Sequence, residues 1–256
     1  MTRIPLVSGV AALVLTVATV LPLAAAETPP PIWDLNLGLA YLATTGNSKT
    51  SSLGLDSAYV HNWRVWKLEA GALARRSDEN GALTSERYSG TVRGTRALTS
   101  TLGLTAGLLG ERDRFSGLDL RGVVDLGLRW TPINTDRYTV EGTPGLTYNH
   151  EEFVIAGLVN DDYLGGLLGA RATAKLSPSS SAFAEAQYIP DFEHSRNYRM
   201  NGKLGAQANL TSLLALKAAY EVRYTNEPVP GFGKTDTAAT VSLVFHAVRP
   251  APAPAP

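Results

Sequence analysis

The chain contains no cysteine, and among its 256 residues only two are methionine and four are histidine. The lack of cysteine excludes a disulfide framework, a thiolate metal site and a cysteine nucleophile. Neither sign of charge is in excess, since 23 Lys and Arg balance 23 Asp and Glu, so electrostatic binding of nucleic acid is not expected. Beyond its first 26 residues the chain also lacks any apolar run long enough to span a membrane as a helix.

One long apolar run does occur, at the start of the chain. Residues 1–26 combine an early basic residue, Arg3, with an apolar centre and small residues up to Ala26, which is typical of a cleaved secretory signal peptide. An uncleaved inner-membrane anchor is the alternative, but Pro22 interrupts the run and its length is close to the minimum for a spanning helix. We expect residues 27–32 to form an extended linker.

Alternation of apolar and polar residues fills most of the remaining chain. Leu126 and Leu128, for example, are interleaved with Asp125 and Arg129. Successive side chains of a β-strand point to opposite faces, so one face here is apolar enough to meet lipid while the other carries full charges. The alternation therefore predicts a membrane β-barrel.

The number of strands follows from their length, because a tilted strand needs about 9–11 residues to cross a membrane. An even number is required to place both ends of the barrel in the periplasm. We therefore predict an all-β protein, a single transmembrane antiparallel β-barrel of about twelve strands over residues 33–246, with a Pro/Ala-rich tail at 247–256. The expected strands are 33–42, 51–62, 64–75, 86–98, 101–113, 119–131, 137–149, 162–176, 181–190, 197–210, 213–225 and 235–246.

Connections of alternating length and two groups of aromatic residues give the orientation. Short turns are expected to face the periplasm and long loops the cell exterior, and aromatic side chains gather at both membrane interfaces. A soluble barrel with its apolar face inward is the alternative, and the two aromatic groups argue against it. The long loops are expected at 44–51, 77–85, 114–118, 150–161, 191–196 and 226–234. The aromatic residues include Trp33, Trp66 and Trp130 at periplasmic ends and Tyr41, Tyr88 and Tyr148 at outer ends.

Several short motifs resemble those of a known bacterial family. They are Thr45-Gly46-Asn47-Ser48 followed by Ser51-Ser52-Leu53-Gly54-Leu55, then Asp113-Arg114-Phe115-Ser116-Gly117-Leu118-Asp119-Leu120-Arg121, and Glu141-Gly142. Over nearly all of its mature length the chain is similar to the salt-induced outer-membrane proteins, also described as domain of unknown function 481. The resemblance implies an outer-membrane location, and the family name hints at a salt or osmotic response. The family has no settled activity, so the resemblance carries over no site residues.

No arrangement of side chains indicates catalysis, a metal site or a cofactor. The four histidines are scattered: we expect His150 and His194 in outer loops, His61 beside a periplasmic turn and His246 after the last strand. A lipid hydrolase on a barrel wall would need a serine, a histidine and an orienting acid or amide together. We therefore predict a non-enzymatic protein with no catalytic, metal-binding or cofactor-binding residues.

The inward face of the barrel is where a function is expected, because rings of charge inside a pore set ion selectivity. The candidate residues have mixed signs with a slight basic excess. They either line a narrow channel for ions or small solutes or pair into a plug that leaves the barrel structural; binding at the outer loops is a further alternative. The lumen-lining candidates are Lys67, Arg93, Arg121, Asp125, Arg129, Glu141, Arg171, Lys203, Lys217, Glu221 and Arg223.

The expected partners follow from an outer-membrane location. We predict contact with outer-membrane lipid and lipopolysaccharide and none with nucleic acid, and the oligomeric state stays open. Barrels of this class commonly carry an aromatic residue in their last strand that the outer-membrane assembly machinery reads. Phe245 is the expected assembly signal in this chain.

Overall fold

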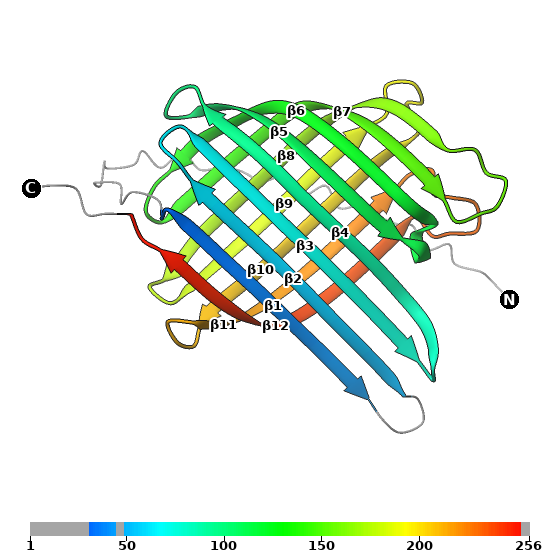
Figure 1. Ribbon diagram of the computed structural model, residues 1–256, viewed down its shortest axis with the longest axis horizontal. Helices are drawn as coiled ribbons and strands as arrows, with labels where there is room; N and C mark the ends of the chain where they lie inside the picture. The colour runs from blue at the N-terminus through cyan, green and yellow to red at the C-terminus, as the bar shows by residue number, and fades with distance from the viewer. Residues whose placement is uncertain (1–30, 45–48, 252–256) are drawn as a thin grey trace, which may run out of the picture.

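The computed structural model describes residues 31–44 and 49–251, and this part of the chain forms one closed antiparallel barrel (Figure 1). The strands are β1 (Trp33–Thr44), β2 (Thr50–Asn62), β3 (Trp66–Glu79), β4 (Ala82–Ala97), β5 (Leu102–Asp113), β6 (Leu118–Asn134), β7 (Tyr138–Phe153), β8 (Asp161–Ser177), β9 (Ser180–Pro190), β10 (Tyr198–Asn209), β11 (Leu214–Thr225) and β12 (Thr235–Arg249), with a 3-10 turn, η1 (Arg114–Ser116), before β6. Each strand pairs with its neighbours in sequence, and β1 pairs with β12 to close the barrel. The prediction of an antiparallel barrel of about twelve strands is confirmed.

The structure describes only part of the segments predicted for the two ends of the chain. The predicted signal peptide lies outside them, as do residues 27–30 of the predicted linker and residues 252–256 of the predicted tail. β12 continues to Arg249, which pairs with Trp33, so residues 247–249 belong to the barrel and not to the tail. No helix among the described residues is long and apolar enough to cross a membrane.

The connection between β3 and β4 is much shorter than expected. The long loop predicted over residues 77–85 is wrong, because both strands continue until only Asn80 and Gly81 remain between them. These two residues have φ values of 51° and 84°. Asn-Gly is the preferred pair for a two-residue hairpin turn with positive φ at both positions, so the signal was present in the sequence.

Short and long connections otherwise lie at opposite ends of the barrel, as predicted. The connection between β4 and β5 and that between β8 and β9 belong to the short set, which gathers where β12 ends, at the left of Figure 1. The segments 114–117, 154–160, 191–197 and 226–234 lie at the opposite end. Following the orientation expected from the sequence, we call this second end the outer mouth and the first the periplasmic mouth.

The apolar face of the alternation points away from the lumen. Leu126 on β6 is 56% exposed, whereas the preceding residue, Asp125, is 7% exposed and points inward. Large exposed side chains follow the same pattern: Trp66 and Trp130 stand near the periplasmic mouth and Tyr41 near the outer mouth. A soluble barrel needs an apolar interior, and this barrel has a charged one.

A close backbone approach between β6 and β7 depends on two glycines. Gly127 and Gly145 are paired in register, and a Cβ atom on Gly127 would lie 2.6 Å from the backbone oxygen of Pro144. Gly127→Ala is therefore expected to lower the free energy of unfolding by about 1–3 kcal/mol, because backbone must move to admit the methyl group. Urea unfolding of the refolded barrel measures it. Gly122→Ala, on the same strand with open space around it, is the control and has no such cost; equal effects would contradict the prediction.

Candidate functional site in the barrel lumen

A cavity of about 1030 Å³ occupies the lumen. Its lining contains ten Lys and Arg and eleven Asp and Glu, so the predicted slight basic excess is wrong and the lumen is close to neutral. Lys67, one of the sequence candidates, does not line the cavity; its Nζ lies 3.1 Å from Oε1 of Glu69. The other ten candidates do line it: Arg93, Arg121, Asp125, Arg129, Glu141, Arg171, Lys203, Lys217, Glu221 and Arg223.

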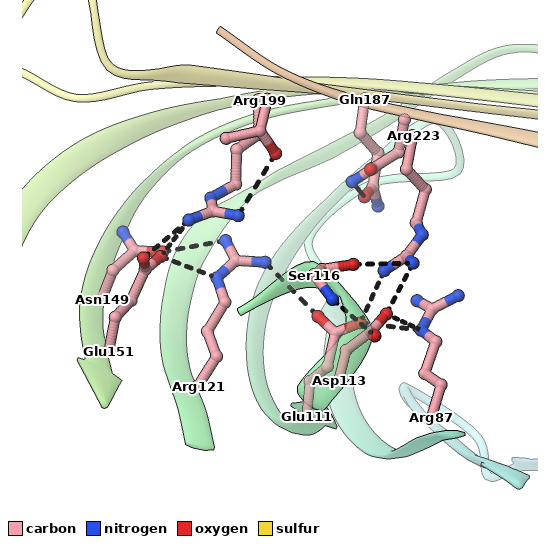
Figure 2. Close-up of polar contacts among 12 residues, drawn as sticks. Arg87, Glu111, Asp113, Ser116, Arg121, Asn149, Glu151, Gln187, Arg199 and Arg223 are labelled. Carbon is pink, nitrogen blue, oxygen red and sulfur yellow. Dashed lines mark hydrogen bonds and ion pairs between the residues drawn. The ribbon is translucent and has the colours of Figure 1, made fainter. Parts of the chain in front are cut away.

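Seven charged side chains contact one another in the part of the lumen next to the outer mouth (Figure 2). They come from β4, β5, β6, β7, β10 and β11, so half of the strands of the barrel wall contribute to them. We call them the outer network. Its members are Arg87, Glu111, Asp113, Arg121, Glu151, Arg199 and Arg223.

Glu151 on β7 is the most buried member of the outer network, at 2% exposure. Nη2 of Arg199 donates to both of its carboxylate oxygens, at 2.8 and 2.6 Å. The Tyr163 hydroxyl donates to it at 3.0 Å, and Nε of Arg121 lies 3.2 Å from Oε1. A carboxylate buried to this degree is costly unless it is paired and hydrogen-bonded, and here two guanidinium groups and a hydroxyl provide that pairing.

A second part of the outer network is built around two carboxylates of β5. Arg87 donates through Nε to Glu111 at 2.8 Å. Arg223 donates through Nη1 to Glu111 at 3.2 Å and through Nη2 to Asp113 at 2.6 Å. Asp113 also accepts from the backbone N–H of Ser116, which ties the network to η1.

A more accessible cluster, the inner network, lies nearer the periplasmic mouth. Glu69 accepts a hydrogen bond from Arg129 and lies 3.6 Å from Nη1 of Arg171. Arg171 also pairs with Glu185 at 3.1 Å, and Arg129 lies 3.8 Å from Glu141. The Arg171 side chain is 48% exposed, compared with 4% for Arg121 in the outer network. Solvent therefore reaches Arg171 far more readily than the outer network, whereas Arg129, Glu69 and Glu141 are only 12%, 16% and 15% exposed.

Several ion pairs cross the lumen from wall to wall. Arg223 on β11 pairs with Glu111 on β5, and five strands separate β11 from β5 in either direction around the barrel. Glu221, also on β11, accepts from Arg75 on β3 at 3.1 Å and from Arg87 on β4 at 2.7 Å. These side chains divide the lumen into narrower spaces.

One cation of the cavity lining stands apart from this pairing. Among the described residues, no carboxylate lies within ion-pair distance of Lys203, whose Nζ is 6.0 Å from the centre of the Phe183 ring. Glu185 is its register partner on β9 but pairs with Arg171 instead. Lys203 is thus the lining residue whose charge is least compensated by the protein.

The histidines form no catalytic or metal-binding cluster in the described part of the chain. The prediction that His150 lies in a loop is wrong: it belongs to β7 and contacts Asp162 at 2.8 Å and Glu152 at 3.3 Å. His246 lies inside β12, 3.2 Å from Asp34. His61, in contrast, contacts the hydroxyl of Tyr59 at 2.8 Å.

Sequence reasoning did not name several members of the outer network as candidates. Arg87, Glu111 and Arg199 occupy inward positions of strands that were expected, so the alternation itself could have found them. Glu151 was missed because the strand containing it was expected to end at residue 149, whereas β7 continues to Phe153.

The comparisons with known proteins agree with this architecture. The sequence model of the family described as "Protein of unknown function, DUF481" matches residues 37–246. A protein of Escherichia coli (strain K12), "Uncharacterized protein YdiY", is 27% identical over 220 residues, which cover 82% of this chain and 81% of that protein. The translocator domain of the autotransporter NalP from Neisseria meningitidis has the same fold, with a TM-score of 0.50, 16% identity, and coverage of 86% of this chain and 90% of that one. The NanC porin matches with a TM-score of 0.45 and 12% identity over 86% and 99% of the two chains.

Proposed function

The chain belongs to the family described as domain of unknown function 481, and from this premise we propose that it is a narrow outer-membrane channel for ions or small polar solutes. The observation that supports the proposal is the cavity, whose lining reaches from Asn160 and Gly233 in the outer loops to Glu141 and Arg171 near the periplasmic mouth. Half-exposed charges inside a barrel need water around them, and a hydrated lumen is a path for ions.

The same proposal includes the route to the membrane. Residues 1–26 direct export, and Phe245 on the lipid-facing side of β12, where it is 41% exposed, is read by the outer-membrane assembly machinery. The wall then contacts lipid and lipopolysaccharide. Loss of surface-exposed protein after Phe245→Ala, with normal export to the periplasm, is the expected sign of that role.

Single-channel recording tests the channel directly. The mature chain, residues 27–256, is refolded, shown to be folded by its resistance to unfolding, and added to a planar lipid bilayer with a salt gradient. Discrete conductance steps are expected, with weak ion selectivity because the lining charges nearly cancel. Silence from folded protein would contradict the proposal.

Reversing the charge of Lys203 is expected to make the channel more selective for cations. Reversal changes the energy of a monovalent ion about 7 Å away by roughly 1 kcal/mol in water, and salt screening reduces this to a change of about two- to fivefold in the permeability ratio. The reversal potential of Lys203→Glu measures it. Lys49→Glu makes the same change on an exposed residue outside the cavity lining and is the control. Equal reversal potentials for both variants would show that ions do not pass Lys203.

A plugged structural barrel is the second candidate, favoured by the ion pairs that cross the lumen. On that alternative, charge reversals in the lumen lower stability and no variant conducts.

The suggested link to salt stress also has a physical route within the channel proposal. Salt screens the exposed pair of Arg171 and Glu185, at 48% and 36% side-chain exposure, more than the buried outer network, so single-channel conductance is expected to rise more steeply with salt concentration than bulk conductivity.

A further inference from the structure

The loop between β11 and β12, residues 226–234, has a rigid tip. The backbone N–H of Phe232 donates to the carbonyl oxygen of Val229 at 3.0 Å, and Gly231 between them has a φ of 90°. With Pro230 preceding that glycine, this is the pattern of a type II turn. The base of the loop is also fixed, since Asn226 donates through Nδ2 to the carbonyl oxygen of Arg196 at 2.8 Å.

The tip packs against η1 through a position that only glycine can fill. Val229 is 8% exposed. A Cβ atom on Gly117, which follows η1, would lie 2.6 Å from Cβ of Val229 and 3.0 Å from Cδ2 of Phe232. Gly117 also has a φ of 86°, which side chains disfavour. The apolar tip and the bare backbone at Gly117 therefore fit closely.

This contact spans the whole outer mouth. The connection between β5 and β6 and that between β11 and β12 are separated by six strands on each side of the barrel, so they lie opposite one another. The segment 154–160 joins them at the same point, because Val154 donates its backbone N–H to the carbonyl oxygen of Gly117 at 3.0 Å. Three outer connections thus meet at Gly117 above the lumen.

Polar contacts directly beneath the tip link the same two walls. Ser116 donates through Oγ to Asp236 at 3.0 Å, and Arg223 lies between Asp113 and Asp236, at 2.6 and 3.5 Å. Pro228, Val229 and Gly233 line the cavity from above. A solute entering from outside meets the tip of the loop before it meets the outer network.

We propose that residues 226–234 form a strap that closes the outer mouth and opens by releasing its tip, Val229 and Phe232, from Gly117. This inference rests on the proposed channel and adds its gate. The closed strap leaves the cavity in contact with the periplasmic side, and release of the tip connects it to the exterior.

The absence of cysteine from the chain allows a direct test by thiol labelling. A single cysteine replaces Val229, which is near its size, and the rate of modification by a polymer-linked maleimide is measured on the folded full-length barrel in lipid vesicles. Val159→Cys is the control, because Val159 lies in the neighbouring loop and is 83% exposed. A closed strap predicts that the cysteine at position 229 reacts at least about tenfold more slowly than the one at 159.

Variants that release the tip from Gly117 then test the strap and the channel separately. Adding Gly117→Ala to Val229→Cys pushes the tip away, and Phe232→Ser, which leaves Gly117 in place, does the same if the first variant fails to fold. Each is expected to raise the labelling rate about tenfold or more and to raise single-channel conductance. Labelling at position 229 as fast as at 159 in the otherwise native chain would overturn the strap, whatever the conductance. If the variants with a released tip are labelled faster but do not conduct, the result supports the strap and overturns the proposed channel.

Discussion

Replacing Glu151 with glutamine is expected to lower the free energy of unfolding of the barrel by about 3–5 kcal/mol. The change keeps the size of the side chain but removes the charge that pairs with Arg199 and Arg121. Arg121 is only 4% exposed, so water cannot replace the lost partner. The measurement is urea unfolding of the refolded protein in lipid vesicles, followed by tryptophan fluorescence.

The neighbouring residue provides a matched control for this experiment. Glu152 follows Glu151 on β7 but faces outward, is 40% exposed at its side chain and contacts His150. Glu152→Gln is therefore expected to change the unfolding free energy by less than about 0.5 kcal/mol. If both variants unfold at the same urea concentration as the native chain, Glu151 is not paired as the structure has it.

Removing both partners at once tests the reason for the loss. Glu151→Leu combined with Arg199→Met takes away a carboxylate and the guanidinium that donates to both of its oxygens. Arg121 keeps Glu111 at 3.7 Å and donates to Asn149 at 3.2 Å. The double variant is expected to recover most of the stability lost in Glu151→Gln, because replacing a buried pair by apolar groups is often neutral.

The fold was predictable because the two faces of each strand meet different solvents. Leu126 is apolar and the adjacent Asp125 is charged, so the two side chains favour opposite faces of the strand. The same alternation repeats along the barrel, so the number of strands and the face on which each side chain lies follow from local pattern alone. The errors lie at strand ends. β7 and β12 run past the expected boundaries because pairing with a neighbouring strand continues after the apolar pattern fades.

The pairing inside the lumen was not predictable to the same extent. Arg223 and Glu111 are 112 residues apart in sequence, and their contact depends on the barrel closing so that β5 and β11 face one another. Alternation places both side chains inward but does not fix which wall they face or at what height. The near-neutral lining likewise depended on acids such as Glu111 and Glu151 that the candidate set omitted.

The same side chains determine both the charge balance and the width of the lumen. Arg223 both neutralises the carboxylates of β5 and bridges the lumen, so a substitution there alters selectivity, width and stability together. Glu221 is more favourable for separating these effects, since it is 15% exposed and its loss leaves Arg87 paired with Glu111. Only Arg75 then loses the partner that the structure gives it.

Glu221→Ala is expected to shift the selectivity of the proposed channel towards anions and to raise its conductance severalfold. The change removes the carboxylate that links β11 to β3 and β4, and it leaves the Arg75 guanidinium free in the lumen. One uncompensated charge changes the energy of an ion about 5 Å away by roughly 1 kcal/mol in water, which is enough to move the reversal potential of a near-neutral pore towards that of chloride.

A comparison of three variants separates charge from width in this result. Glu221→Gln keeps the volume and removes the charge, so it is expected to shift the reversal potential as Glu221→Ala does while raising conductance less. Glu86→Ala removes a carboxylate that contacts Tyr88 on the opposite face of β4, and it should change neither quantity. If folded Glu221→Ala matches the native chain in both, ions do not pass between β11 and β4, and the ion pairs that cross the lumen act as a plug.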